Sequence, residues 1–330
     1  MTESTTAGTG PDLFPVVFDD LAVVEARLRA AVHSRLPVVP EVYLHTVHAG
    51  GKRVRPALAL LAGRLVGEAR EATFDVAVAV ELIHLASLIH DDVIDDGGRR
   101  RARLTANRVW GNKTAVLVAD FTHAVAYRLL AARCPVAVIE RLSATVVRMC
   151  EGELAQMYNE GSPDVSEALY LEICGDKTAS LMALACELGV LVSGGDQVQA
   201  AILAQYGQKL GLAFQVVDDL LDLTGDEERL GKPVGNDVRC GRLTLPLIHA
   251  LAQPEPLAGR VRQLITRATV TVETIVELRR ALAEAGSLAY GAEAARRLST
   301  EASELLTPFP DGEPRQALAA LAAYVVARTQ

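Results

Sequence analysis

The chain has 330 residues, half of them hydrophobic and only 4% aromatic, which allows one large domain or two ordinary ones built mainly from small and aliphatic side chains. Its formal net charge is −8, from 33 basic and 41 acidic residues. This balance excludes the broad basic face of a general nucleic-acid-binding protein, but it leaves room for a local cluster that holds a small anion.

The N-terminal residues 1–12 contain neither the basic region nor the apolar region of a signal peptide, and we expect them to form a disordered tail. No apolar run approaches the ~18 residues needed to span a bilayer. Five cysteines occur without a CxxC pair, which predicts neither a disulfide framework nor a zinc site and suits a reducing compartment. The sequence therefore predicts a cytoplasmic protein without a transmembrane segment.

From residue 13 to residue 330 the sequence predicts a single all-α domain. Apolar residues recur every three or four positions, as on the buried face of a helix, and glycine or proline separates the segments. No convincing strand alternation, βαβ rhythm or solenoid repeat interrupts them. The expected helical segments are 18–34, 54–66, 72–95, 113–132, 136–159, 167–193, 197–223 and 273–306.

A first basic group precedes the expected helix 54–66, where residues 50–56 read GGKRVRP. The free backbone N–H groups and the dipole of a helix start favour an anion near Lys52 and Arg55. The group is not a Walker A loop, because the upstream glycine of that motif is missing. The alternative interpretation is a capped helix start with solvated charges.

The expected helix 72–95 is apolar until it ends in the acidic sequence DDVIDD. Asp91 and Asp95 are four residues apart and therefore share one face of a helix, where like charges repel. Aspartate is also a poor helix former, and its charge opposes the dipole at a helix C-terminus. His84 shares this face about two turns earlier, where a core histidine with satisfied hydrogen bonds is the ordinary alternative.

Four arginines follow the acidic sequence within residues 99–103. Guanidinium groups bind phosphate oxygens in a bidentate manner, so a basic run beside carboxylates indicates recognition of a phosphate group. The alternative is a surface run that only neutralises the aspartates.

A second acidic group repeats the arrangement at the end of the expected helix 197–223, with Asp218, Asp219 and Asp222. A magnesium ion resolves the repulsion in both groups, because Mg²⁺ prefers oxygen ligands and is typically held by one or two carboxylates plus substrate phosphates. Solvated helix ends are the alternative. Two such motifs, each after an apolar helix, favour a functional site, since conflicts with local rules concentrate there.

Residues 224–242 form a long, charged and glycine-rich stretch between two helical segments. A surface loop is the simple interpretation. Long loops in compact domains are also frequently lids or binding loops, so this stretch is a candidate lid.

Together these segments resemble the trans-isoprenyl diphosphate synthases, the polyprenyl synthetase family, and come closest to its medium- and long-chain members. The resemblance covers residues 45–250 densely and is carried by GGKRVRP, LIHDDVIDDGGRRR, the KT of GDKTASL, GLAFQVVDDLLDLTGD and GKPVGNDVRCGRLTLP. It implies the isoprenoid synthase fold, an all-α bundle around a deep central apolar cavity, with the two aspartate motifs facing each other at its mouth. Ala102, Arg103 and Leu104 depart from the family's usual Gly, Lys and Pro without touching an implied ligand.

The resemblance also implies roles for individual residues. The magnesium ligands are Asp91, Asp95, Asp218 and Asp222, supported by Asp92 and Asp219, with three Mg²⁺ ions in the substrate complex. Isopentenyl diphosphate is bound by Lys52, Arg55, His84 and Arg101. The allylic diphosphate is bound by Arg100, Lys177, Thr178, Gln215 and Lys232, of which Lys177, Gln215 and Lys232 count as catalytic.

The implied activity is the magnesium-dependent, head-to-tail condensation of isopentenyl diphosphate with an allylic diphosphate such as farnesyl diphosphate, in a homodimer. Ala86 and Ser87 stand where short-chain members carry a bulky aromatic floor, which predicts a hexaprenyl to decaprenyl product that is delivered to a membrane. Ile83 and Phe121 are the candidate blockers deeper in the pocket.

Three alternatives to this activity remain. A geranylgeranyl diphosphate synthase is the alternative in product length. A class I terpene cyclase is disfavoured because the second metal motif is again DDxxD, and a non-catalytic partner subunit is disfavoured because both motifs are intact.

Overall fold

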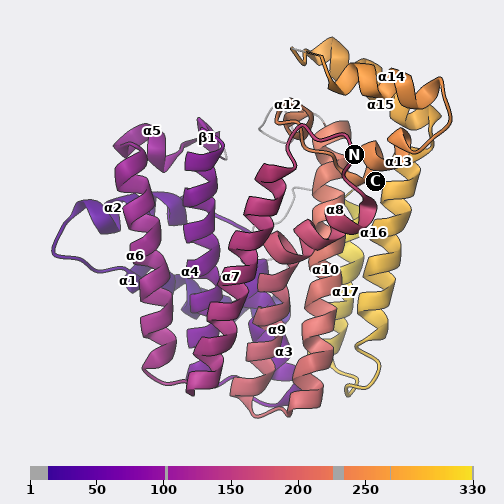
Figure 1. Cartoon of the computed structure of the whole chain (residues 1–330). Coiled ribbons are helices and arrows are strands. Elements are labelled where there is room, and N and C mark those ends of the chain that lie inside the picture. The colour runs from indigo at the N-terminus through magenta and orange to yellow at the C-terminus, as the bar shows by residue number, and fades with distance from the viewer. Residues whose placement is uncertain (1–13, 101–102, 226–233, 268, 329–330) are drawn as a thin grey trace, which may run out of the picture. The chain divides into compact units, whose positions relative to one another are not determined.

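The computed structural model describes residues 14–100, 103–225, 234–267 and 269–328, and these are almost entirely helical (Figure 1). The chain divides into two compact units. Unit 1 comprises residues 1–144, 184–204 and 309–318, and unit 2 comprises residues 145–183, 205–308 and 319–330. Four helices contribute residues to both units, namely α7 (Val136–Tyr158), α9 (Ser180–Ser193), α10 (Gln197–Thr224) and α17 (Glu313–Ala327).

Unit 1 is built around the long helix α4 (Glu71–Ile94). Its other helices are η2 (Pro15–Val17), α1 (Phe18–Ala31), α2 (Val38–His48), α3 (Val54–Val66), α5 (Ala106–Trp110) and α6 (Asn112–Ala131). Helix α4 packs against α1, α3 and most extensively against α6, so that Leu82, Ile83 and Ala86 are fully buried. Because neighbours surround most of α4, it is apolar on most of its faces.

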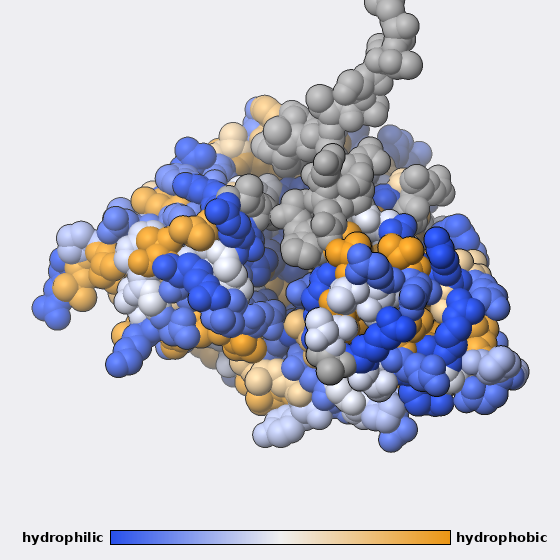
Figure 2. Space-filling model, turned by 90° about the horizontal axis from the view of Figure 1, so that it is seen from above, coloured by the Kyte–Doolittle hydropathy of each residue, from blue (hydrophilic) through white to orange (hydrophobic). Residues whose placement is uncertain are grey.

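Helices α4 and α6 are long and apolar enough to cross a membrane by length and composition alone. The expectation that no segment reaches this length is therefore corrected. In α4, 72% of the most apolar stretch is buried inside the protein, which assigns its side chains to the core of unit 1. Figure 2 shows one face of the molecule, on which hydrophilic residues predominate and hydrophobic residues form small groups between them.

In unit 2, α10 packs closely against η3 (Gly175–Ala179) and α9, which follow α8 (Glu167–Cys174). A Cβ atom at Gly207 would lie 2.6 Å from the carbonyl oxygen of Met182, and one at Gly211 would lie 2.5 Å from the Cα atom of Ala179. Only glycine fits at these two positions. The close approach places the middle of α10 beside η3 and the start of α9.

The C-terminal part of unit 2 has its own hydrophobic core. It is formed by α13 (Leu245–Leu251), α14 (Leu257–Ile265), α15 (Val272–Glu284) and α16 (Ser287–Glu304). Figure 1 shows α14 and α15 running side by side. Leu223 at the end of α10 and Val238 in α12 (Asn236–Arg239) are buried in the same cluster as Leu247, Val261 and Leu278. This core thereby anchors the end of α10, directly after the second aspartate motif, and the segment that carries α12.

The expected all-α fold is confirmed, with local differences that have identifiable causes. The segment expected as one helix over 167–193 is interrupted by η3, a π-helical turn. The segment expected over 273–306 is divided at Gly286, whose φ of +68° is left-handed and ends α15. Sequence periodicity misses both breaks, because each covers only a few residues of an otherwise helical pattern.

The structure also contains short elements that the sequence pattern does not predict. Strands β1 (Arg99–Arg100) and β2 (Arg103–Leu104) form a short antiparallel hairpin, too brief for an alternating pattern. Helix α12 lies inside the stretch 224–242 that was expected to be a loop. The expected disordered tail falls on residues 1–12, outside the described part of the chain.

Candidate active site

The first aspartate motif closes α4, as the sequence predicts. The helix ends at Ile94, and the backbone N–H of Asp95 donates to the carbonyl oxygen of Asp91 at 2.8 Å. The next residue, Asp96, has a φ of +49° and turns the chain out of the helix. Asp91 is half-buried and Asp95 is exposed, one helical turn apart at the edge of unit 1.

The hairpin after α4 holds an arginine on this motif. Arg100 donates from Nε and Nη2 to Oδ1 of Asp92, at 3.0 and 2.8 Å. The side chain of Asn107 donates to the backbone carbonyl of Asp92 at 3.0 Å, and Thr105 Oγ1 donates to the carbonyl of Gly97 at 2.6 Å. These bonds tie the hairpin to the end of α4, so that Arg100 is fixed beside the carboxylates. Arg101 lies outside the described residues.

The basic group at residues 50–56 separates into a structural arginine and two partly exposed cations. Arg53 is only 7% exposed and pairs with Glu81 of α4 and Glu25 of α1, each at 2.9 Å. Burial acts against the charge of Arg53, but Glu81 and Glu25 outweigh it and raise the pKa of the guanidinium. Lys52 and Arg55 flank this anchor and are half-buried, which leaves them accessible to an anion.

The residues expected to set product length lie in α4 and in its neighbour α6. Ile83 and Ala86 are fully buried in α4. Ser87 is half-buried, and its Oγ donates to the carbonyl of His84 at 2.9 Å. Phe121 is half-buried on α6.

In unit 2, Asp219 of the second aspartate motif lines a pocket of about 130 Å³ together with residues from α8, η3 and the segment after α12. Thr178 Oγ1 donates to Gln215 Oε1 at 2.9 Å, and Gln215 Nε2 donates to Asp219 Oδ1 at 2.8 Å. On its other oxygen, Asp219 accepts a bond of 2.6 Å from the hydroxyl of Tyr170. The structure therefore brings Lys177, Thr178, Gln215 and Asp219 into one pocket.

The surroundings of Asp219 disfavour a negative charge on its carboxyl group. Burial raises the pKa of Asp219 well above its usual value, and the nearby Asp237 raises it further. The hydrogen bonds from Tyr170 and Gln215 act in the opposite direction but do not compensate. Burial and the carboxylate of Asp219 also raise the pKa of Tyr170. A cation near this pocket would relieve the unfavourable negative charge.

Lys177 reaches this pocket from the π-helical turn. It forms an ion pair with Glu153 of α7, and Arg148 of the same helix pairs with Asp176 at 2.6 Å. A Cβ at Gly152 would lie 2.7 Å from the backbone nitrogen of Lys177, so α7 needs a glycine there. The π-turn, a feature frequent at functional sites, places Lys177 and Thr178 together in the pocket.

The other two aspartates of the second motif face different partners. Asp218 forms an ion pair of 3.0 Å with Arg328, whose guanidinium also lies over the ring of Phe214 at 5.0 Å. Asp222 accepts hydrogen bonds from the backbone N–H of Asp237 at its side chain, 3.0 Å, and from that of Gly235 at its carbonyl, 2.7 Å. Asp222 thus fastens the segment after residue 233 to the end of α10, whereas Lys232 lies outside the described residues.

Sequence reasoning missed three residues of this site. Asp237 lies within the GKPVGNDVRCGR motif, but no spacing in that motif singles it out. Tyr170 and Arg328 have no local signal, since their partners are 49 and 110 residues away in the chain.

Comparison with known proteins decides the family. The model of the polyprenyl synthetase family matches residues 37–282. The chain belongs to the polyprenyl synthetase family. An octaprenyl diphosphate synthase of Haemophilus influenzae is 36% identical to it over 310 residues, 94% of each chain. Component 2 of the heptaprenyl diphosphate synthase of Geobacillus stearothermophilus is 38% identical over 317 residues, 95% of this chain and 97% of that protein.

A solved polyprenyl synthase supports the same assignment. The crystal structure of the enzyme from Caulobacter crescentus, complexed with calcium and isoprenyl diphosphate, matches with a TM-score of 0.91 at 35% identity, over 99% of this chain and 100% of that one. The family resemblance and the fold class expected from the sequence are thereby confirmed. Members of the polyprenyl synthetase family are prenyltransferases and generally depend on Mg²⁺.

The residues of both aspartate motifs fit a divalent metal by their donor chemistry. All of the predicted ligands are carboxylates, which suit Mg²⁺. In each unit a carboxylate of the motif already attracts a protein cation, Arg100 on Asp92 and Arg328 on Asp218. Together with the raised pKa of Asp219, this indicates surroundings that favour positive charge.

Proposed function

We propose that the chain is an all-trans polyprenyl diphosphate synthase, which joins isopentenyl diphosphate head-to-tail to an allylic diphosphate such as farnesyl diphosphate. The observation that carries the proposal is membership of the polyprenyl synthetase family together with two intact aspartate motifs, each accompanied by cationic side chains in its own unit. The names of the relatives, octaprenyl and heptaprenyl diphosphate synthase, support a medium- or long-chain product over a geranylgeranyl product.

The carboxylates are assigned to the metal. Asp91, Asp95 and Asp218 are the proposed magnesium ligands, because they are exposed or half-buried in the described structure. Asp222 is also a proposed metal ligand. In addition, it supports the site structurally, because its side chain binds the backbone N–H of Asp237 in the segment after residue 233. Bound Mg²⁺, in three ions, supplies the positive charge that neutralises the diphosphate leaving group.

The basic side chains are assigned to the two diphosphates. In unit 2, Lys177 and Thr178 bind the allylic diphosphate, and Gln215 orients Thr178 through their mutual hydrogen bond. The family motif also assigns Arg100 to the allylic diphosphate, and on binding Arg100 exchanges Asp92 for phosphate oxygens. Two further assignments, Arg101 to isopentenyl diphosphate and Lys232 to the allylic diphosphate, rest on the family motif alone.

Isopentenyl diphosphate is assigned to the basic group before α3. Lys52 and Arg55 bind its diphosphate while Arg53 holds the backbone in place, and His84 lies on α4 two turns before Asp91.

The proposed reaction breaks one bond and forms another. The allylic C–O bond breaks, and diphosphate leaves with the electron pair. The double bond of isopentenyl diphosphate attacks the allylic carbon, and the departed diphosphate accepts the proton that is lost as the new trans double bond forms.

Product length is assigned to the small residues of α4. Ala86 and Ser87 lie five and four residues before Asp91, which is about 6 to 7.5 Å along the helix axis. Their small side chains leave room for a growing hydrocarbon chain past this level, toward Ile83 and Phe121. The expected product is hexaprenyl to decaprenyl diphosphate, an apolar molecule that is handed on to a membrane.

The proposed working form is a cytoplasmic homodimer in which residues 13–330 act as one catalytic domain. Exposed apolar residues on α6 and α7, such as Leu117 and Val147, offer surface for a second copy. The name of one relative, component 2 of a heptaprenyl diphosphate synthase, raises a two-component enzyme as the specific alternative.

The test is a product assay with the purified chain alone. Farnesyl diphosphate and labelled isopentenyl diphosphate are incubated with Mg²⁺, and the dephosphorylated products are sized, with a chelator-treated sample as control. We expect a hexaprenyl to decaprenyl product that depends on Mg²⁺. Elongation that stops at geranylgeranyl would reject the product length, and a chain without any incorporation would be a partner subunit.

A further inference from the structure

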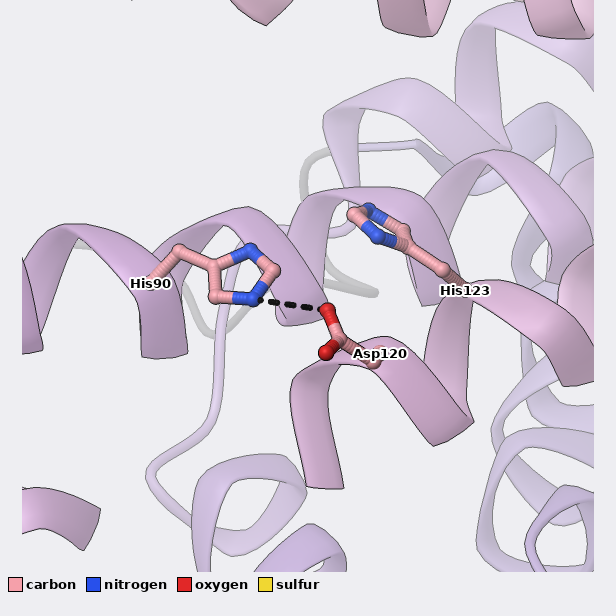
Figure 3. A group of neighbouring side chains, drawn as sticks. All are labelled: His90, Asp120 and His123. Atoms are coloured by element: carbon pink, nitrogen blue, oxygen red, sulfur yellow. Dashed lines mark ion pairs between the residues drawn. The ribbon is translucent and has the colours of Figure 1, made fainter. Parts of the chain in front are cut away.

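A cluster of three metal-binding side chains lies in unit 1, separate from the proposed magnesium ligands. His90 of α4 faces Asp120 and His123 of α6, and each residue offers a ligand atom within 4.8 Å of the other two (Figure 3). Nε2 of His90 is 3.2 Å from Oδ1 of Asp120, and the two imidazole rings are 5.6 Å apart between centroids. Asp120 and His123 are three residues apart and therefore project from the same face of α6.

One nitrogen of His123 is unsatisfied in the described structure. Nε2 of His123 is buried and has no hydrogen-bond partner among the described residues. Buried polar atoms are normally satisfied, so such an atom indicates an absent partner. Burial, and next the neighbouring His90, lower the pKa of His123 to about 4, so the imidazole is neutral at physiological pH. A neutral imidazole nitrogen is the form that binds a metal.

The chemistry of the three donors selects the kind of ion. Two imidazoles and one carboxylate suit a first-row transition ion such as Zn²⁺, whereas Mg²⁺ prefers oxygen ligands only. Zinc bonds of about 2.0 to 2.2 Å in a tetrahedron place the ligand atoms roughly 3.3 to 3.6 Å apart. The His90–Asp120 pair is already near this spacing, and small side-chain rotations bring in His123.

The surroundings leave room for a fourth ligand. The side chain of Asp120 is 60% exposed and that of His90 is 27% exposed, so water reaches the cluster from one side. A site with three protein ligands and an open position results. Helices α4 and α6 also pack extensively against each other, which holds the donors in place without the ion.

We propose that His90, Asp120 and His123 form a binding site for one Zn²⁺-class ion per chain, distinct from the magnesium site of the aspartate motifs. The ion joins α4 to α6 and fixes the last turn of α4, because His90 directly precedes Asp91. The site does not depend on the proposed function, since none of its three ligands is assigned to a substrate or to Mg²⁺.

The test is a zinc titration of the purified full-length chain after removal of bound metals with a chelator. Magnesium is kept in large excess, so that sites with oxygen ligands are saturated, and Zn²⁺ is delivered in competition with a chromophoric chelator. The key variant is His123→Leu, which removes one ligand and the unsatisfied nitrogen together. The matched control is His33→Leu, the same substitution at an exposed histidine of unit 1.

We expect one Zn²⁺ per chain in the wild type and in His33→Leu, and a rise in Tm on binding. In His123→Leu the affinity should fall at least tenfold, because loss of even an outer-sphere partner costs about 10- to 100-fold. Should His123→Leu not fold, Asp120→Asn provides the same comparison at an exposed position. Zinc binding that survives both substitutions, or that excess Mg²⁺ abolishes, would overturn the proposal.

Discussion

Glu81 and Arg53 provide a direct test of how the basic group before α3 is held. Arg53 is 7% exposed and Glu81 is 3% exposed, and their side chains meet at 2.9 Å. Removing one partner of a buried ion pair typically costs about 3–5 kcal/mol, because the other charge stays buried without compensation. Glu25 remains as a second partner of Arg53 at 2.9 Å, so we expect the lower end, about 3 kcal/mol, for Glu81→Leu.

The measurement is urea unfolding of the ligand-free protein, followed by circular dichroism. Arg53, Glu81 and Glu25 form one buried network in unit 1, so the unfolding transition should move to lower urea. The double variant Arg53→Met/Glu81→Leu should recover much of the loss, because it leaves no buried charge unpaired. A loss below about 1 kcal/mol in Glu81→Leu, or a double variant less stable than the single one, would refute the reasoning.

The same network has a kinetic and a pH signature. Lys52→Ala should leave the urea midpoint unchanged and raise the KM for isopentenyl diphosphate, whereas Glu81→Leu should change both.

Burial opposes ionisation of Glu25, but Arg53 outweighs it and lowers the pKa of Glu25 below 4.5. Its stabilising contribution is therefore present above pH 4.5 and is lost as the pH falls through the lowered pKa. Wild type and the double variant should accordingly converge in stability at acid pH.

Three further predictions concern the proposed active site. Asp91→Ala and Asp218→Ala should each abolish incorporation of labelled isopentenyl diphosphate. Asp91→Ala should not lower the unfolding midpoint, because it removes a carboxylate from a repelling group, whereas Asp218→Ala also loses the partly exposed ion pair with Arg328 and should cost at most about 1 kcal/mol. Retained turnover would contradict the assignment. Ala86→Phe should shorten the product in the sizing assay, at a stability cost of about 1–3 kcal/mol for overpacking a fully buried position; an unchanged product would place the chain-length floor elsewhere. Arg328→Gln should lower the Mg²⁺ concentration for half-maximal activity, by at most about fivefold because the Arg328–Asp218 pair is partly exposed; a raised requirement would show that Arg328 assists binding.

The sequence alone determined the features that depend on local order. Helix α4 was expected over 72–95 and spans Glu71–Ile94, and α3 was expected and found over residues 54–66. Hydrophobic periodicity and the spacing of Asp91 and Asp95 involve residues within a few turns, so neighbouring positions carry the information. The order of the motifs along the chain identified the family for the same reason.

Only the tertiary structure decided which residues of each motif are buried and which partners they have. Arg53 is a buried anchor and Lys52 beside it is accessible, although the two are adjacent cations in the sequence. Tyr170 lies 49 residues from its partner Asp219, Arg328 lies 110 residues from Asp218, and His90 lies 33 residues from His123 in the chain. Burial and the charges of residues far away in the chain set the pKa of a side chain and decide whether its polar atoms are available to a metal. The linear order of residues records neither the burial nor these distant charges.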